Sequence, residues 1–133
     1  MRLFLILEPG VVFQGFPKIY LPSLSVCLVD SSRKKNNFLK YVIRLLNLKN
    51  IFAYKYRVEQ LSNLPDFAGQ FDVVSSRAFT SLKSFLELSV PLIKPEGCII
   101  AMKGKEVQKE VDELKAAETG DNLYIINDNK FDL

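Results

Sequence analysis

The sequence predicts a single α/β domain, residues 1–133, built on a doubly wound and mostly parallel sheet. Short apolar runs rich in branched side chains alternate with segments of helical periodicity, which is the pattern of parallel strands joined by crossover helices. The chain can also bury a sizeable core, because 48% of its 133 residues are hydrophobic and 25% are charged. It contains no internal repeat, low-complexity tract or interdomain linker.

The expected strands are apolar runs, several of which end in polar residues. FDVVSS, for example, opens like a buried parallel strand and leads into a polar turn that carries Arg77. Pro95, Glu96 and Gly97 are expected to form the turn that leads into the fifth strand. The six expected strands are residues 2–7, 25–30, 50–56, 71–76, 97–104 and 122–128.

The expected helices lie between these strands. Apolar side chains recur with helical spacing through residues 38–48, and the serines at 31–32 are the candidate N-caps of that helix. Thr80 or Ser81 is expected to begin the next helix. Residues 106–118 are charged, with apolar side chains three and four positions apart, and predict a solvated amphipathic helix.

The composition excludes several classes of function. The chain contains no histidine, which removes the usual imidazole base, the Ser-His-Asp and Cys-His nucleophile systems and the commonest zinc ligand. Cys27 and Cys98 lie in apolar runs, as expected for buried thiols of a reducing cytoplasm. No apolar run approaches the roughly 18 residues that a membrane span needs, and Glu8 and Pro9 interrupt the first one before it could act as a secretory segment.

Polar residues at the strand ends are the candidate ligand-binding residues, because open parallel sheets bind ligands beyond the carboxyl ends of their strands. Asp30 closes the second strand, 20 residues after Gly10. An acid at that distance can accept hydrogen bonds from ribose hydroxyls, or it can cap the following helix. Arg77 can bind a carboxylate through its planar fork, or it can form a salt bridge with Glu59 or Asp72.

Basic residues are candidates for contact with an anionic partner. Arg33, Lys34 and Lys35 stand at the start of a predicted helix, where they can meet phosphates or form a solvated face. Lys103 follows an apolar strand. It is either a ligand contact or a surface lysine whose aliphatic chain packs on apolar residues while its ammonium stays in water. The net charge of +3 suits an anionic partner without identifying one.

Five sequence motifs together resemble one family. LVDSSRKKNNFLKYVIRLLNLKNI, RVE, FDVVSSRAFTSL, PLIKPEG and AMKG occur in this order. They resemble, in the same order, the motifs of the bacterial ribosomal RNA small-subunit methyltransferase G, also called glucose-inhibited division protein B. The resemblance extends from about residue 8 to residue 104, and the SRA and AMKG motifs are its most specific parts.

The resemblance implies a Rossmann-like doubly wound S-adenosylmethionine-dependent methyltransferase fold, incomplete at its C-terminal edge. It implies methylation of the N7 of a guanine in 16S ribosomal RNA, with that RNA or the small ribosomal subunit as partner, in the cytoplasm and without metal or membrane. N7 carries a free lone pair, so the reaction needs no base to remove a proton, which agrees with the missing histidine. No catalytic residue is assigned. The residues that match cofactor-binding positions of the family are Gly10, Phe13, Asp30, Val58, Glu59 and Arg77.

The first loop departs from the family pattern. Gly10 and Gly15 match family glycines, but Glu8 and Pro9 replace Gly-Ser and Val12 replaces another glycine. Glycines there let the backbone turn sharply and approach the ligand, whereas a proline removes an amide donor. We expect these changes to weaken cofactor binding. The same loop does not fit a nicotinamide-binding G-x-G-x-x-G motif either.

The ends of the chain also depart from the family. The first strand begins almost at Met1, and we expect the final strand, residues 122–128, to lack its antiparallel neighbour. The alternative to an active enzyme is a truncated, non-catalytic remnant of the methyltransferase fold, or an RNA-binding module with impaired cofactor binding.

Overall fold

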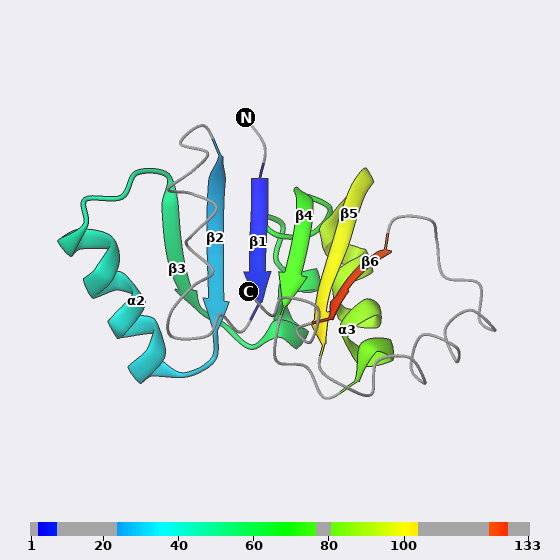
Figure 1. The fold of residues 1–133 in the computed structure, drawn as a ribbon, viewed down its shortest axis with the longest axis horizontal. Coiled ribbons are helices and arrows are strands. Elements are labelled where there is room, and N and C mark those ends of the chain that lie inside the picture. The colour runs from blue at the N-terminus through cyan, green and yellow to red at the C-terminus, as the bar shows by residue number, and fades with distance from the viewer. Residues whose placement is uncertain (1–2, 8–23, 77–80, 104–122, 128–133) are drawn as a thin grey trace.

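The computed structural model describes residues 3–7, 24–76, 81–103 and 123–127, and it shows one parallel sheet with helical segments beside it (Figure 1). The strand order is β3-β2-β1-β4-β5-β6, and every neighbouring pair is parallel. The order reverses between β1 and β4, as in a doubly wound sheet, which confirms the predicted fold class. The elements in chain order are β1 (Leu3–Leu7), β2 (Ser25–Asp30), α2 (Arg33–Leu45), β3 (Ile51–Lys55), the 3-10 helix η1 (Val58–Asn63), β4 (Phe71–Ser76), α3 (Leu82–Ser89), the 3-10 helix η2 (Val90–Leu92), β5 (Ile93–Lys103) and β6 (Leu123–Asn127).

The expected strands and helix starts agree closely with these bounds. The second and fourth strands match to the residue, and the two described α-helices begin after the expected serines. The Ser32 hydroxyl accepts the Lys35 N–H at 3.3 Å, and the Ser81 hydroxyl accepts the Ser84 N–H at 3.1 Å. Both serines are therefore N-caps. The helix expected at residues 106–118 lies outside the described residues.

The prediction for the start of β5 was wrong. Pro95, Glu96 and Gly97 were expected to form a turn ahead of the strand, but β5 already begins at Ile93, which pairs with Phe71. The pairing register shifts between Phe71 and Val73, so residues 94–97 form an irregularity inside the strand. A Cβ at Gly97 would lie 3.0 Å from the Asp72 carbonyl oxygen, and this close approach of two backbones requires glycine.

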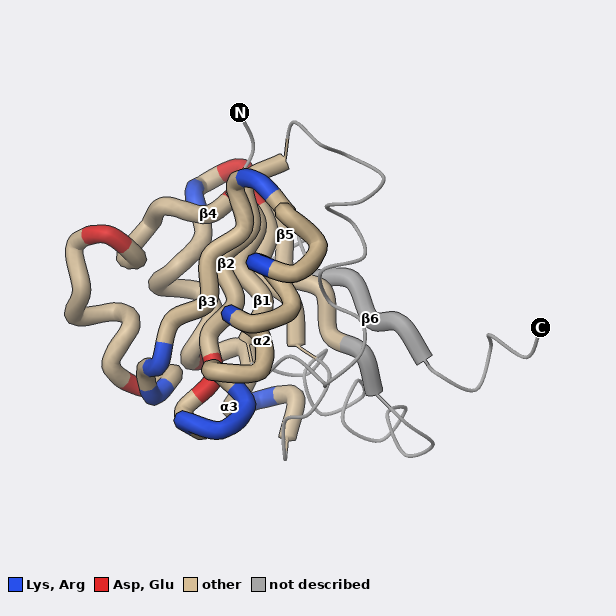
Figure 2. The backbone as a smooth tube through the Cα atoms, turned by 90° about the vertical axis from the view of Figure 1, so that its left-hand side faces the viewer, with Lys and Arg blue, Asp and Glu red and all other residues tan. Residues whose placement is uncertain are grey.

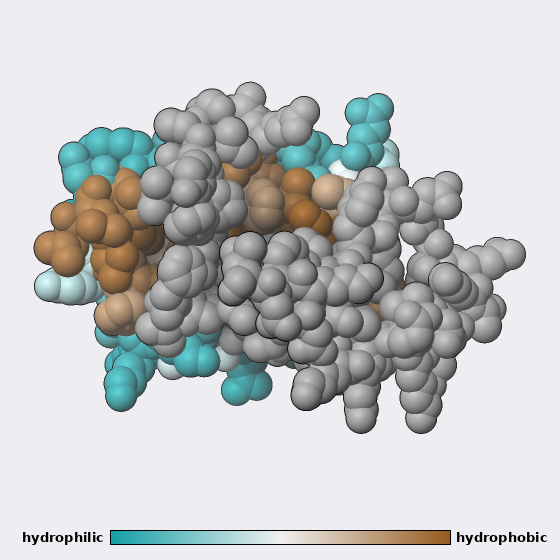
Figure 3. Space-filling view, viewed as in Figure 1, coloured by the Kyte–Doolittle hydropathy of each residue, from teal (hydrophilic) through white to brown (hydrophobic). Residues whose placement is uncertain are grey.

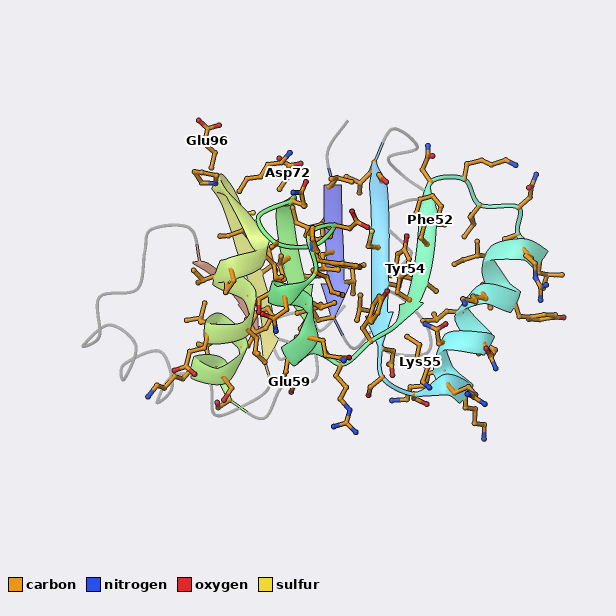
Figure 4. The ribbon with its side chains drawn as sticks, turned by 180° about the vertical axis from the view of Figure 1, so that it is seen from behind. Phe52, Tyr54, Lys55, Glu59, Asp72 and Glu96 are labelled. Atoms are coloured by element: carbon orange, nitrogen blue, oxygen red, sulfur yellow. The ribbon has the colours of Figure 1, made fainter. Side chains whose placement is uncertain are left out.

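The core has two parts, one on each face of the sheet. On the α2 face, Ile6, Val26 and Leu28 pack with Leu39 and Ile43 of the helix. On the other face, side chains of β1, β4 and β5 pack against η1, α3 and η2, which cover that face in the rear view (Figure 4). This larger cluster includes Leu5, Leu7, Leu61, Phe67, Phe71, Val74, Leu82, Phe85 and Leu92.

Helix α2 ends in a Schellman turn. Asn47 adopts a positive φ of 50°, and the N–H groups of Asn47 and Leu48 donate to the Arg44 and Ile43 carbonyl oxygens at 3.1 and 3.0 Å. Apolar side chains gather on the exposed side of this helix (Figure 3). They include Phe38, Tyr41, Leu45 and Leu46, which are 44–65% exposed.

Candidate active site

Asp30 ends β2 at the carboxyl edge of the sheet, one residue beyond the Leu7–Val29 pair. Its side chain is 1% exposed. The carboxylate Oδ1 accepts the Ser32 N–H at 2.8 Å, which holds the turn into α2. The other oxygen, Oδ2, is buried and has no hydrogen-bond partner among the described residues. A buried carboxylate oxygen without a donor is costly, so this atom is a ready acceptor for a ligand hydroxyl.

Ser76 ends β4 on the other side of β1 and pairs with Leu7. Its hydroxyl is also buried without a partner among the described residues. Asp30 and Ser76 are separated by two strand spacings, or about 10 Å, and so they flank the end of β1 at the point where the strand order reverses. Two buried polar atoms that have no partner among the described residues thus lie at the position where sheets of this kind bind ligands.

Asn36 carries a third unpaired polar atom. Its side chain is 2% exposed, and its Nδ2 has no partner among the described residues. Sequence reasoning did not select it. It shares the sheet-facing stripe of α2 with Leu39 and Ile43, at spacings of three and seven, and an amide on that otherwise apolar stripe was the available signal.

Val58 and Glu59 begin η1, immediately beyond the carboxyl end of β3. The Val58 side chain is buried in the core cluster with Leu61 and Phe67, so only its backbone can face a ligand. The Glu59 side chain is exposed at the carboxyl edge (Figure 4). The first N–H groups of a helix have no acceptor within it, so those of Val58 and Glu59 are potential donors beside Asp30.

Asp72 lies at the opposite, amino edge of the sheet (Figure 4). Its Oδ2 accepts the Leu3 N–H at 2.8 Å and lies 3.4 Å from the Lys94 ammonium. Since the extended strand β4 separates Asp72 from the carboxyl edge, this carboxylate has a structural role of its own.

The remaining predicted site residues are described only in part. Arg33, Lys34 and Lys35 form the exposed first turn of α2. Lys103 is the last residue of β5, and its side chain is not among those described. Three predicted cofactor-binding residues lie outside the described residues: Gly10, Phe13 and Arg77.

The cysteines take no part in this edge. Both thiols are free and half-buried rather than fully buried. Burial raises the pKa of the Cys27 thiol to about 11. Burial, and to a smaller extent the charge of Asp72, raises the pKa of the Cys98 thiol.

The described segments lack two kinds of feature. In residues 3–7, 24–76, 81–103 and 123–127, no group of three or more His, Cys, Asp or Glu side chains is placed to hold a metal ion. No helix in these same ranges has the length and apolar character needed to cross a membrane.

Comparison with known proteins identifies relatives over most of the chain. A family model described as rRNA small subunit methyltransferase G matches residues 9–127. The ribosomal RNA small subunit methyltransferase G of Mycoplasma capricolum is 39% identical over 119 residues, which cover 90% of this chain and 48% of that protein. The protein of the same name from Geobacter sp. strain M21 is 43% identical over 105 residues, which cover 76% and 48%. The chain thus spans about half the length of these relatives.

Solved structures support the fold. PKMT2 of Rickettsia typhi in complex with AdoHcy superposes with a TM-score of 0.62 at 18% identity, covering 74% of this chain and 20% of that one. A SAM-dependent methyltransferase from Aquifex aeolicus gives a TM-score of 0.58 at 20% identity, covering 74% and 54%. At these identities the likeness concerns the fold alone.

Proposed function

The chain belongs to the rRNA small subunit methyltransferase G family, and we propose that it transfers a methyl group from S-adenosylmethionine to the N7 of a guanine in 16S ribosomal RNA. The observation that carries this proposal is the buried Asp30 carboxylate, whose Oδ2 has no partner among the described residues at the carboxyl edge. In sheets with this strand order, an acid at the end of the second strand accepts hydrogen bonds from a nucleoside ribose.

The described residues fit the cofactor chemically. Asp30 Oδ2 would accept a hydrogen bond from a ribose hydroxyl, while Oδ1 stays bound to the Ser32 N–H. The N–H groups of Val58 and Glu59 would donate to acceptor nitrogens of the adenine, because they have no acceptor inside η1. The Ser76 hydroxyl, on the far side of β1, would contact the other end of the ligand.

Once bound, S-adenosylmethionine supplies a methyl group that is already activated by its sulfonium. The catalytic role of the chain is then to hold the guanine N7 in line with that methyl group and to keep water away. Guanine N7 has a free lone pair at neutral pH, so no side chain has to remove a proton. Alignment of two reactants can lower a barrier by about 7–11 kcal/mol. A chain without histidine can therefore carry out this reaction.

The proposed substrate also suggests the partner and the compartment. A guanine of 16S ribosomal RNA would reach the chain on naked RNA or on the small ribosomal subunit, both of which are cytoplasmic in bacteria. The exposed Arg33, Lys34 and Lys35, in the first turn of α2 next to Asp30, would contact phosphates near the target.

Calorimetric titration with S-adenosylmethionine is the first test, followed by transfer of a labelled methyl group to 16S RNA and to small subunits. Mass spectrometry of nuclease digests would identify the modified atom and position. If the titration produces no binding heat at millimolar S-adenosylmethionine, the proposal that the chain is a methyltransferase is wrong. Binding without transfer to either substrate would remove the proposed substrate and leave the cofactor site in place.

A non-catalytic role is the second candidate, and the sequence of the first loop supports it. Glu8 and Pro9 stand where the family has Gly-Ser, and Val12 replaces a third small residue. A loss of a few kcal/mol at such a loop would weaken cofactor binding about a hundredfold or more. In that case the chain would bind RNA without methylating it. Restoring glycine at positions 8 and 12 would then raise cofactor affinity.

A further inference from the structure

A groove of about 540 Å³ lies between α2 and the edge strand β3, away from the Asp30 site. One wall is the helix, with Asn37, Lys40, Ile43 and Arg44, and the other is residues 51–54 of β3. Among the described strands, β3 is the outermost at this end of the sheet and pairs only with β2. The groove therefore follows a free strand edge.

The helix wall carries a stripe of polar side chains beside Ile43. Arg33, Asn37, Lys40 and Arg44 are spaced by four, three and four residues, which places them on one side of α2. Lys40 and Arg44 are exposed and make no ion pair with any described residue. The stripe runs from the carboxyl edge of the sheet, where α2 begins, toward the amino edge (Figure 1).

The charge distribution around the groove is one-sided. Residues 31–58, which comprise α2 and β3, contain eight Lys or Arg and no Asp or Glu. The remainder of the chain carries ten basic and fifteen acidic residues, so it is net negative although the whole chain is +3. Basic residues recur along α2 when the molecule is viewed from this side (Figure 2). A surface of one sign selects an anionic partner.

The first turn of α2 places positive side chains at the end of the helix where the helix dipole is also positive. Arg33, Lys34 and Lys35 occupy the positive end of the helix, and no acidic residue lies in that turn. Cations at this end are unfavourable by roughly 0.3–1 kcal/mol each. Helix stability does not explain such a turn, whereas contact with a polyanion does.

The backbone of β3 runs along the other wall of the groove. The Val26 N–H donates to the Asn50 carbonyl oxygen at 2.9 Å, and the Val26–Ile51 register continues this ladder to Phe52 and Tyr54. In a parallel ladder, alternate residues turn their N–H and C=O groups away from the partner strand. Ile51 and Ala53 therefore direct theirs away from β2, but both residues are buried, at 4% and 8% exposed, so the exposed side chains of the helix wall are the available contacts.

We propose that this groove binds a single strand of the substrate RNA, which runs along α2 from the carboxyl edge toward Arg44. Lys40 and Arg44 bind successive phosphates, Asn37 donates to the sugar-phosphate backbone, and the target guanine is presented at the carboxyl edge. This inference rests on the proposed function, because it takes RNA as the substrate. Phosphate contacts of this kind fix the position of a strand without reading its sequence.

Fluorescence anisotropy with a labelled, unstructured single-stranded RNA of about 12 nucleotides tests the inference, since single-strand sites span roughly 4–16 nucleotides. Titrations at several salt concentrations give the slope of log K against log salt. Lys40→Gln and Arg44→Gln should each weaken binding several-fold and reduce the slope by about 0.7, the value for one phosphate contact on a single strand. The variant that combines Lys40→Gln and Arg44→Gln should show both losses of affinity and both reductions of the salt slope. Circular dichroism checks that α2 is still folded.

Lys94→Gln is the matched control. It removes the same charge, but Lys94 lies on β5, on the far side of the sheet from β3, and is paired with Asp72. Binding of RNA by this variant should stay close to that of the unchanged protein. An equal loss in the control and the groove variants would mean that only net charge matters, and would overturn the proposal.

Two other outcomes would assign the groove to another occupant and overturn the proposal. One is unchanged RNA binding by the groove variants together with Arg44-dependent binding of an extended acidic peptide, which would pair with the edge of β3. The other is a dimer in sedimentation that Arg44→Gln dissociates. Calorimetry with S-adenosylmethionine separates this proposal from the proposed function, because groove variants should bind cofactor normally whether or not the groove holds RNA.

Discussion

Asp30→Asn should separate a cofactor-binding carboxylate from a residue that only shapes the turn into α2. The side chain is 1% exposed and has two distinct oxygens. One accepts the Ser32 N–H at 2.8 Å, and the other has no partner among the described residues. An asparagine has the same shape but only one oxygen. It can keep the Ser32 bond or accept from a ribose hydroxyl, but it cannot do both.

The expected result is a loss of cofactor affinity with little loss of stability. A hydrogen bond to a charged group contributes about 1.5–3 kcal/mol, which corresponds to roughly a 10- to 150-fold increase in the Kd for S-adenosylmethionine. Without ligand, the free energy of unfolding should change by less than about 1 kcal/mol, because the amide oxygen can still accept the Ser32 N–H. Calorimetric titration measures the affinity, and urea unfolding measures the stability.

Asp72→Asn provides the control. It makes the same chemical change at the amino edge, where the carboxylate holds the Leu3 N–H and the Lys94 ammonium. This variant should bind the cofactor normally and lose some stability. An unchanged Kd in Asp30→Asn would show that the unpaired oxygen does not face the ligand. An equal loss of affinity in both variants would show that the carboxyl edge is not the site.

Three further predictions concern single side chains. Ser76→Ala should lower cofactor affinity in calorimetry while leaving the unfolding free energy unchanged or higher, because it removes a buried hydroxyl that has no partner among the described residues. Gly97→Ala should lower the urea-unfolding free energy by about 1–3 kcal/mol, because the new Cβ would meet two backbone oxygens at 3.0 Å, and an unchanged value would contradict the close approach. Burial raises the pKa of the Cys27 thiol to about 11, so folded protein should react with a thiol reagent at pH 8 far more slowly than urea-unfolded protein. The pKa of Cys27 is higher in the folded than in the unfolded protein, so the contribution of this thiol to the free energy of unfolding is complete below pH 9 and is lost as the pH rises toward 11. Cys27→Ala should therefore reduce the fall of the unfolding free energy between pH 9 and pH 11.

The parts of the fold that sequence predicted are those that local chemistry determines. A run of apolar residues followed by Asp30 and Ser32 fixes both the end of β2 and the cap of α2, because capping and burial act within a few residues. The start of β5 could not be predicted in this way. Pro95 and Gly97 are strong turn signals, but pairing of Ile93 with Phe71 absorbs them as an irregularity within the strand.

The same distinction between local and long-range determinants applies to the candidate site. The position of Asp30 at a strand end could be predicted, because it is visible in the sequence, and its role in binding stays a prediction. Asn36 could be noticed as an amide on an apolar stripe, but its lack of a partner among the described residues could not be predicted, because it depends on atoms from other elements. The groove was missed for a related reason. Lys40 and Arg44 look like ordinary surface residues of a helix until the strand order places that helix along a free edge.

The proposed cofactor site and the proposed RNA groove belong to one structural unit, and this constrains how they can work together. Asp30 and Lys55 are register partners on β2 and β3, and α2 connects these strands. The strand pairing therefore places the β3 wall of the groove on the strand next to the one that ends in Asp30. An RNA strand held by Lys40 and Arg44 would approach the cofactor from the β3 side of the sheet. The direction from which the guanine meets the methyl group would then be set by the position of α2 beside β3, as a reaction that depends on alignment requires.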